Sequence, residues 1–297
     1  MRPIHRSRCR GCAHPHLAAG AALLAALAFA GTAAAQGRDW QPKKQGHRLG
    51  AQLEVWPVEG GTTVTGELVG QIAVLDELMI DFSLPSAYGS YDFFGPTIDA
   101  FILGNPAAGL HWGDKVTDAL ALWAGGKITF PILIDPDAEP GFVAGVASRN
   151  RAFFDMDRFA LERLTVRPQF GLEAHFARWF YFRTDVAAPI FIPVADNVDR
   201  DAQTAVAIEH GNEFEGRSNI GLGAGGRLQF LIMATDTDFG DDDRFQAAIE
   251  PYFVFEPHGE DGFFARVGTL IALDAPLGFG LDRGNLATFR VTLGGKW

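Results

Sequence analysis

The chain has 297 residues, of which 47% are hydrophobic and 21% charged, and its formal net charge is −11. A chain of this length forms one large domain or two ordinary ones, with enough apolar residues for a sizeable core. The acidic balance argues against a protein that binds nucleic acid through a basic surface.

The first 35 residues have the pattern of a secretory signal peptide. Four arginines precede the apolar run LAAGAALLAALAFAG, which is followed by the small-residue sequence TAAAQ. Ala33 and Ala35 occupy the −3 and −1 positions, so we expect cleavage after Ala35. The alternative, an uncleaved membrane anchor, fits less well because the run is short and rich in alanine.

Cleavage at that point divides the chain into three parts: a signal peptide (1–35), a periplasmic N-terminal segment (36–46) and a folded domain (47–297). The two cysteines, Cys9 and Cys12, leave with the signal. The exported chain therefore has no disulfide, and its stability must come from elsewhere, such as a fully paired backbone in a closed sheet.

The mature chain shows apolar and polar residues in alternation, which is typical of strands with two different faces. In the last segment, Phe289, Val291, Leu293 and Trp297 share one face and Arg290 lies on the other. The alternation predicts strands at 48–57, 62–74, 77–85, 98–112, 118–132, 160–175, 179–193, 214–222, 226–234, 244–256, 262–273 and 286–297.

The two faces of these strands differ in charge. The apolar face carries no charged residue. The opposite face carries acidic residues at Glu54, Glu67, Asp81, Asp99, Glu173, Asp185, Glu215, Glu250 and Glu256. It carries basic residues at Lys127, Arg163, Arg167, Arg183, Arg217, Arg227, Arg266, Arg290 and Lys296.

A soluble sandwich or a lipocalin-type barrel also has two such faces, with the apolar one buried. An exported, cysteine-free chain of long strands favours a membrane barrel, in which the apolar face meets lipid and the polar face lines the lumen. The predicted fold class is therefore all-β, an antiparallel transmembrane β-barrel after a cleavable signal peptide.

The connections between strands support this interpretation. Short turns alternate with longer loops at 86–97, 133–159, 194–213, 235–243 and 274–285, as expected for periplasmic turns and external loops. Aromatic residues on the lipid face lie at the turn ends of the strands and predict a membrane-interface girdle. These residues are Trp112, Phe180, Phe255, Phe263 and Trp297.

The signal peptide, the alternating strands and the terminal pattern Phe289, Val291, Leu293, Trp297 resemble Gram-negative outer-membrane β-barrel proteins, porins included, without matching one subfamily. The resemblance implies an outer-membrane location, with lipid and lipopolysaccharide as surroundings. It also implies that the barrel-insertion machinery reads the aromatic end of the last strand.

The strand count depends on residues 214–234. Read as one strand, this segment gives eleven strands, and read as a hairpin turning at Gly223–Gly226 it gives twelve. Bacterial single-chain barrels have even counts, so we expect about 12 strands, within a range of 10–12.

The sequence contains no recognisable catalytic or metal-binding motif. The histidines of the mature chain are scattered without metal-ligand spacing, and no serine lies in a recognisable catalytic set. Asp236, Asp238 and Asp241–Asp243 make an acidic loop that could hold a hard divalent cation, but a solvated loop is favoured. We expect no catalytic residue, no metal and no cofactor.

The lumen charges are the candidate functional constellation, nine acidic and nine basic. They predict a narrow passive channel for small polar solutes or ions, because a barrel of about twelve strands is intermediate between filled and open ones. The alternatives are a closed structural or surface-binding barrel acting through its external loops and, as a lesser one, an outer-membrane lipid-modifying enzyme. The oligomeric state does not follow from the sequence. The candidate pore residues are Arg167, Arg183, Asp185, Glu250, Arg266 and Arg290.

Overall fold

A computed structural model describes residues 47–297 except 59, 76, 93–96, 135, 178, 195–203, 236–243, 258–261 and 274–286. Fourteen strand segments lie in this part of the chain. They are β1 (Arg48–Val58), β2 (Gly61–Ala73), β3 (Leu78–Tyr91), β4 (Ile98–Leu103), β5 (Ala107–Thr117), β6 (Leu120–Thr129), β7 (Arg163–Ala177), β8 (Phe180–Ala187), β9 (Ile190–Pro193), β10 (Ala205–Arg217), β11 (Leu222–Met233), β12 (Phe245–Phe255), β13 (Gly262–Ala272) and β14 (Ala287–Lys296). Between β6 and β7 lie the helix α2 (Ala138–Ala147) and the 3-10 helix η1 (Met156–Arg158).

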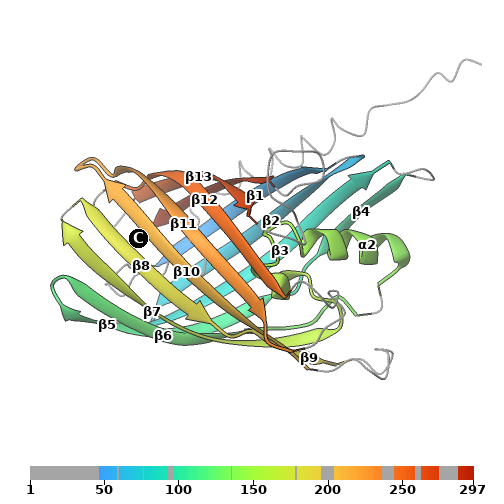
Figure 1. The fold of residues 1–297 in the computed structure, drawn as a ribbon, viewed down its shortest axis with the longest axis horizontal. Coiled ribbons are helices and arrows are strands. Elements are labelled where there is room, and N and C mark those ends of the chain that lie inside the picture. The colour runs from blue at the N-terminus through green and yellow to red at the C-terminus, as the bar shows by residue number, and fades with distance from the viewer. Residues whose placement is uncertain are drawn as a thin grey trace, which may run out of the picture. The chain divides into compact units, whose positions relative to one another are not determined.

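The strands form one closed antiparallel sheet. The first strand, β1, pairs with the last, β14, and β10 pairs with β11, so the sheet has no free edge at either seam. The segments β4 and β5 pair in turn with β3, and β8 and β9 both pair with β7 and β10. β4 and β5 together form one interrupted wall strand, and β8 and β9 form another. The described segments therefore fill twelve wall positions and confirm the expected count. Figure 1 shows these long tilted strands wrapped around the lumen.

Side chains along each strand alternate between a buried lumen side and an exposed outer side. On β12, Phe253 is 71% exposed whereas its neighbour Tyr252 is 2% exposed. On β14, Phe289 and Val291 face outward and Arg290 is buried. Charged groups inside and large apolar groups outside invert the pattern of a soluble barrel and confirm the predicted fold, a transmembrane β-barrel. Within the described part of the chain, no helix is long and apolar enough to cross a membrane.

The barrel has two different ends. One end, called here the turn end, carries the first residue of β1, Arg48, and the last residue of β14, Lys296, together with short connections such as 118–119 and 218–221. The opposite end, called the loop end, carries the two-residue connection 59–60 and the longer connections 92–97, 130–162, 194–204, 234–244 and 273–286. This asymmetry is the one that the sequence predicts.

The hairpin in 214–234 exists, but its turn lies elsewhere than predicted. The chain turns at Ser218–Gly221, where Gly221 has a φ of +82° that favours glycine. Strand β10 extends back to Ala205, so residues 205–213 are strand and not part of a long loop. The outward positions His210 and Asn212 are polar and bond to each other, and they conceal the apolar face there.

The wall strand made of β4 and β5 changes phase at its interruption. In β4 the side chains at 98, 100 and 102 face inward, whereas in β5 those at 107, 109 and 111 do. The inward positions 102 and 107 are an odd number of residues apart, so the alternation reverses across the interruption. Asp99 is therefore on the exposed outer face, and its predicted lumen position is wrong. His111 is buried in the lumen as expected.

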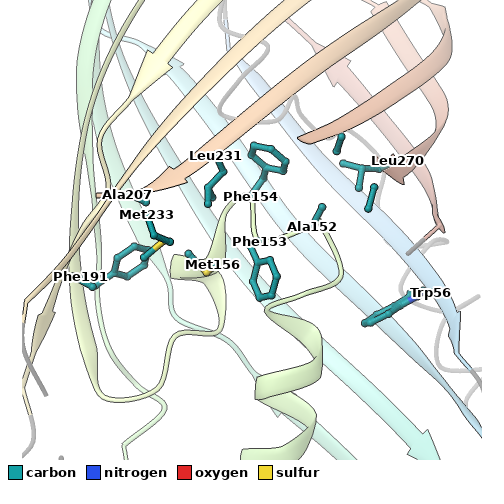
Figure 2. Close-up of a cluster of buried hydrophobic side chains, with 13 residues drawn as sticks. Trp56, Ala152, Phe153, Phe154, Met156, Phe191, Ala207, Leu231, Met233 and Leu270 are labelled. Carbon is teal, nitrogen blue, oxygen red and sulfur yellow. The ribbon is translucent and has the colours of Figure 1, made fainter. Parts of the chain in front are cut away.

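The connection 130–162 folds back into the lumen. Its residues Ala152, Phe153, Phe154 and Met156 are buried in a cluster with apolar wall residues from β1 and β9–β13. The strand faces predicted a lumen that is polar throughout. The structure differs, because the wall near the loop end is partly apolar. Figure 2 shows the loop inside the barrel with these side chains among wall residues. The segment 130–162 is called the inserted loop below.

Candidate functional site

The neck of the inserted loop is held by one buried asparagine. The Asn105 side chain donates to the carbonyls of Asp157 and Ala160 at 3.1 and 2.7 Å. Its amide oxygen accepts from the backbone N–H groups of Ile132 and Leu133 at 3.0 and 3.3 Å. Asn105 is completely buried, and it lies in the interruption between β4 and β5 that reverses the phase. The irregular wall strand thus supplies the clamp that joins both ends of the loop.

One side of the loop is cationic and contacts acidic residues of β1 and β2. Arg158 lies 3.1 Å from the Glu54 carboxylate and 3.5 Å from that of Glu67. Arg151 lies 3.5 Å from Glu54. The Glu54 carboxylate also accepts from Thr65 at 2.8 Å and from Arg290 at 3.1 Å. Burial strengthens such pairs and also makes an unpaired partner costly.

The other side of the loop is anionic and contacts basic residues of β6 and β7. Asp157 lies 3.0 Å from the ammonium of Lys127 and 3.3 Å from the guanidinium of Arg167. Asp155 lies 3.0 Å from Arg167. Lys127 and Arg167 are directly paired across the two strands, so they form one basic patch on the wall.

The third contact of the loop is apolar. Leu231, Met233 and Leu270 of β11 and β13 are buried against the loop cluster, together with Phe191 of β9. In Figure 2 the rings of Phe153 and Phe154 come from the loop and lie among these wall side chains. Burying such a side chain contributes about 1.5–3 kcal/mol, so apolar contact adds substantially to the ion pairs.

The backbone of the inserted loop is strained. Among the residues that the structure describes, the non-glycine residues with positive φ are Ala152 (52°), Phe153 (64°), Asp155 (59°) and Glu162 (55°), and all four lie in this loop. Each such conformation costs on the order of 1–3 kcal/mol. The loop adopts this shape because the wall contacts compensate for the strain.

Below the loop, a buried ion network centred on Glu213 of β10 occupies the lumen. Its carboxylate lies 3.4, 3.2 and 3.4 Å from the guanidinium groups of Arg183, Arg227 and Arg266. Gly211 faces Arg227 so closely that a Cβ there would lie 2.2 Å from the guanidinium, and the glycine makes room for that side chain.

Near the turn end, Glu256 joins a second basic group. It lies 2.9 Å from Arg48, 2.8 Å from Arg217 and 3.3 Å from Lys296. A cavity of about 20 Å³, room for a water molecule, lies between this group and the Glu213 network. The charges of the lumen are thus largely compensated within the protein.

All six predicted pore residues lie on the lumen side and are buried. Arg183 pairs with Glu173 at 2.9 Å as well as with Glu213, and Arg167 also contacts Glu209. Arg290 pairs with Glu250 at 2.6 Å, and a carboxylate oxygen of Glu250 lies 3.9 Å from Arg266. Asp185 pairs with Arg227. Their role in a pore remains a prediction.

The five predicted interface aromatics lie on the outer surface near the turn end. Trp112, Phe263 and Trp297 are about half exposed, and Phe255 is 39% exposed. Phe180 is less exposed because it stacks between Phe176 and Phe214. Their placement fits a girdle, which remains a prediction.

The predicted absence of catalytic and metal sites remains a prediction, and the structure describes only part of the chain. In the described residues, no group of three or more His, Cys, Asp or Glu side chains could hold a metal ion. The acidic loop with Asp236, Asp238 and Asp241–Asp243 lies outside the described residues, as do the signal peptide and the segment 36–46.

Sequence reasoning missed the residues that place the inserted loop. Asn105 lies in the sequence Gly-Asn-Pro, a strong signal for an interruption in a strand. Phe153, Phe154, Met156 and Phe159 are unusually apolar for an external loop. Read together, these two signals point to a loop that is covered by other residues.

Comparisons with known proteins show the fold. No family model and no curated protein matches the chain. The barrel is similar to the NanC porin in its rhombohedral crystal form, with a TM-score of 0.56 at 9% identity over 84% of this chain and 100% of that one. It is also similar to the COG4313 outer membrane channel from Pseudomonas putida F1, with a TM-score of 0.51 at 15% identity over 87% and 97% of the two chains.

Proposed function

We propose that this protein is a narrow passive channel for small polar solutes in the outer membrane of a Gram-negative bacterium. In that membrane the turn end faces the periplasm and the loop end faces outward, and the inserted loop forms the constriction. The outer surface contacts lipid and lipopolysaccharide, and β14 presents its aromatic end to the barrel-insertion machinery. The names of the two similar structures, a porin and an outer membrane channel, support the proposal.

The observation that carries the proposal is the charged lumen beneath a loop held by reversible contacts. Charged side chains lie on the inner wall from the Glu54–Arg158 pair down to Glu256. Polar walls lower the cost of moving a hydrated solute through a barrel, which apolar walls would raise. Ion pairs and apolar contacts can open and re-form, unlike a covalent closure.

A second candidate is a closed barrel that acts through its external surface. It is favoured by the compensation of the lumen charges, with Glu213 and Glu256 each contacting three basic residues. A barrel of this kind conducts nothing.

Single-channel recording in planar bilayers separates the two functions. The protein used is residues 36–297 refolded in detergent, beside a variant in which 149–157 are replaced by a short Gly-Ser linker. A channel gives small current steps in the wild type and larger ones in the variant, because the linker removes the constriction. Silence from both proteins, each shown to be folded, would establish the closed barrel instead.

A further inference from the structure

We propose that the inserted loop occupies a solute-binding site and that this site takes zwitterionic solutes with an apolar part, such as short peptides. The inference rests on the proposed channel and names the class of solute. It follows from how the wall holds the loop, since a site occupied by part of the chain reveals the chemistry that it accepts.

The wall offers the loop three different surfaces. An acidic surface on β1 and β2 holds Arg158, and a basic surface on β6 and β7 holds Asp157. Strand β3 and the wall strand made of β4 and β5 lie between them. An apolar surface on β9–β13 holds Phe153 and Phe154. A solute that replaces the loop must satisfy the same three surfaces.

Two wall residues depend on the loop more than the others do. When the loop is displaced, Glu54 keeps Arg290 and Arg167 keeps Glu209. Among the described residues, the ion-pair partner of Glu67 is Arg158 and that of Lys127 is Asp157. Displacement therefore exposes one carboxylate and one ammonium, which favours a solute carrying both opposite charges.

A singly charged solute is a poorer replacement. It satisfies one of the two wall residues and leaves the other without its partner in a site shielded from water, which is costly. A peptide with free ends supplies an ammonium for Glu67, a carboxylate for Lys127 and side chains for the apolar surface.

The strain in the loop makes displacement feasible. Ala152, Phe153 and Asp155 have positive φ, and they regain ordinary backbone conformations when the loop leaves the wall. This relief offsets part of the contact energy lost. The loop is then a competitor of the solute.

The test measures uptake of three peptides into proteoliposomes, with protein-free liposomes subtracted. The peptides are trialanine, its anionic N-acetyl form and its cationic amide, and each rate is divided by that of arabinose. We expect trialanine to enter several-fold faster than either analogue. The Glu67→Gln, Lys127→Gln variant should lose this preference, whereas Asp114→Asn, Lys115→Gln, a matched pair of changes at the exposed end of β5, should keep it.

Equal rates for the three peptides, or a preference that survives in Glu67→Gln, Lys127→Gln, would overturn the inference while arabinose uptake still upheld the channel. Absence of arabinose uptake would instead overturn the channel.

A second measurement needs no conduction. In the Met156→Cys variant the new thiol is buried in the loop cluster, and it should react faster with a maleimide when trialanine is present. An unchanged rate with trialanine would count against the site.

Discussion

At the scale of single residues, the lumen depends on charges that have several partners each. Arg183 lies between Glu173 and Glu213 at 2.9 and 3.4 Å and is almost fully buried. Replacing it by methionine leaves both carboxylates with one cation fewer in a site of low dielectric. We expect Arg183→Met to lower the free energy of unfolding by about 3–5 kcal/mol.

Urea titration of the protein in lipid vesicles measures this loss. The matched control is Arg217→Met, because the Arg217 side chain is 18% exposed. It contacts Glu215 and Glu256 in the ion group near the turn end. A smaller loss is expected there, since water screens and solvates what remains. Equal unfolding midpoints for the two variants would contradict the ranking.

Asn105 gives a second prediction at this scale. Its side chain satisfies four backbone groups at the neck of the inserted loop, and Asn105→Ala leaves them buried without that partner, at about 1–3 kcal/mol each when unsatisfied. We expect the loop to spend more time outside the wall contacts. Limited trypsin digestion should then cleave after Arg151 and Arg158 several-fold faster than in the wild type.

The control for Asn105→Ala is Asn212→Ala, because Asn212 lies on the outer face of β10 and bonds to His210. Its trypsin cleavage pattern should match that of the wild type. If Asn105→Ala were as resistant as this control, the neck would not depend on the asparagine.

At the scale of elements, period-two alternation predicted most of the wall strands, because each strand separates two solvents, lipid and lumen, and the even strand count of such barrels decided for twelve. It failed where that contrast is weak. The outward His210 and Asn212 hid the first half of β10. The one-residue phase change near Asn105 could not be seen, since apolar residues lie on both sides of it.

The individual contacts of the inserted loop could not be predicted from the sequence for a different reason. Its contacts join residues far apart in the chain, such as Arg158 with Glu54 and Thr288 with Asn150. No local spacing encodes them, so the candidate pore residues could be placed in the lumen but not paired.

The last strand allows a direct test of the assigned faces. Val291 of β14 faces outward and is 36% exposed, and Val291→Arg places a charge toward lipid. Near the bilayer midplane this costs about 2–4 kcal/mol. The folded yield in vesicles, read from the band that migrates fast without boiling, should fall for Val291→Arg and stay near wild type for Val291→Ala. Equal yields would contradict an outward Val291.

At the scale of the whole molecule, the barrel combines a sheet without free edges with an interior that resembles a folded core. Closure satisfies the backbone, which explains how the described strands, which contain no cysteine, form a stable sheet without disulfides. The inserted loop and the compensated charges fill much of the space that closure creates. In the proposed channel, the contacts that stabilise the barrel therefore also determine what passes through it.

Closure itself is testable at the seam between the first and last strands. Leu53 of β1 is opposite Val291 of β14, whereas Val267 of β13 is opposite Val291 from the other side and lies two strands from Leu53. Directly opposed Cβ atoms lie about 4.5–5.5 Å apart, within reach of a disulfide after a small adjustment, and strands two apart are separated by roughly 9–10 Å. In residues 36–297, which contain no cysteine, the pair Leu53→Cys, Val291→Cys should therefore cross-link under oxidant. The cross-linked chain should migrate differently after boiling without reductant, and Leu53→Cys, Val267→Cys should not. If neither pair cross-links in the folded protein, β1 and β14 do not form the seam.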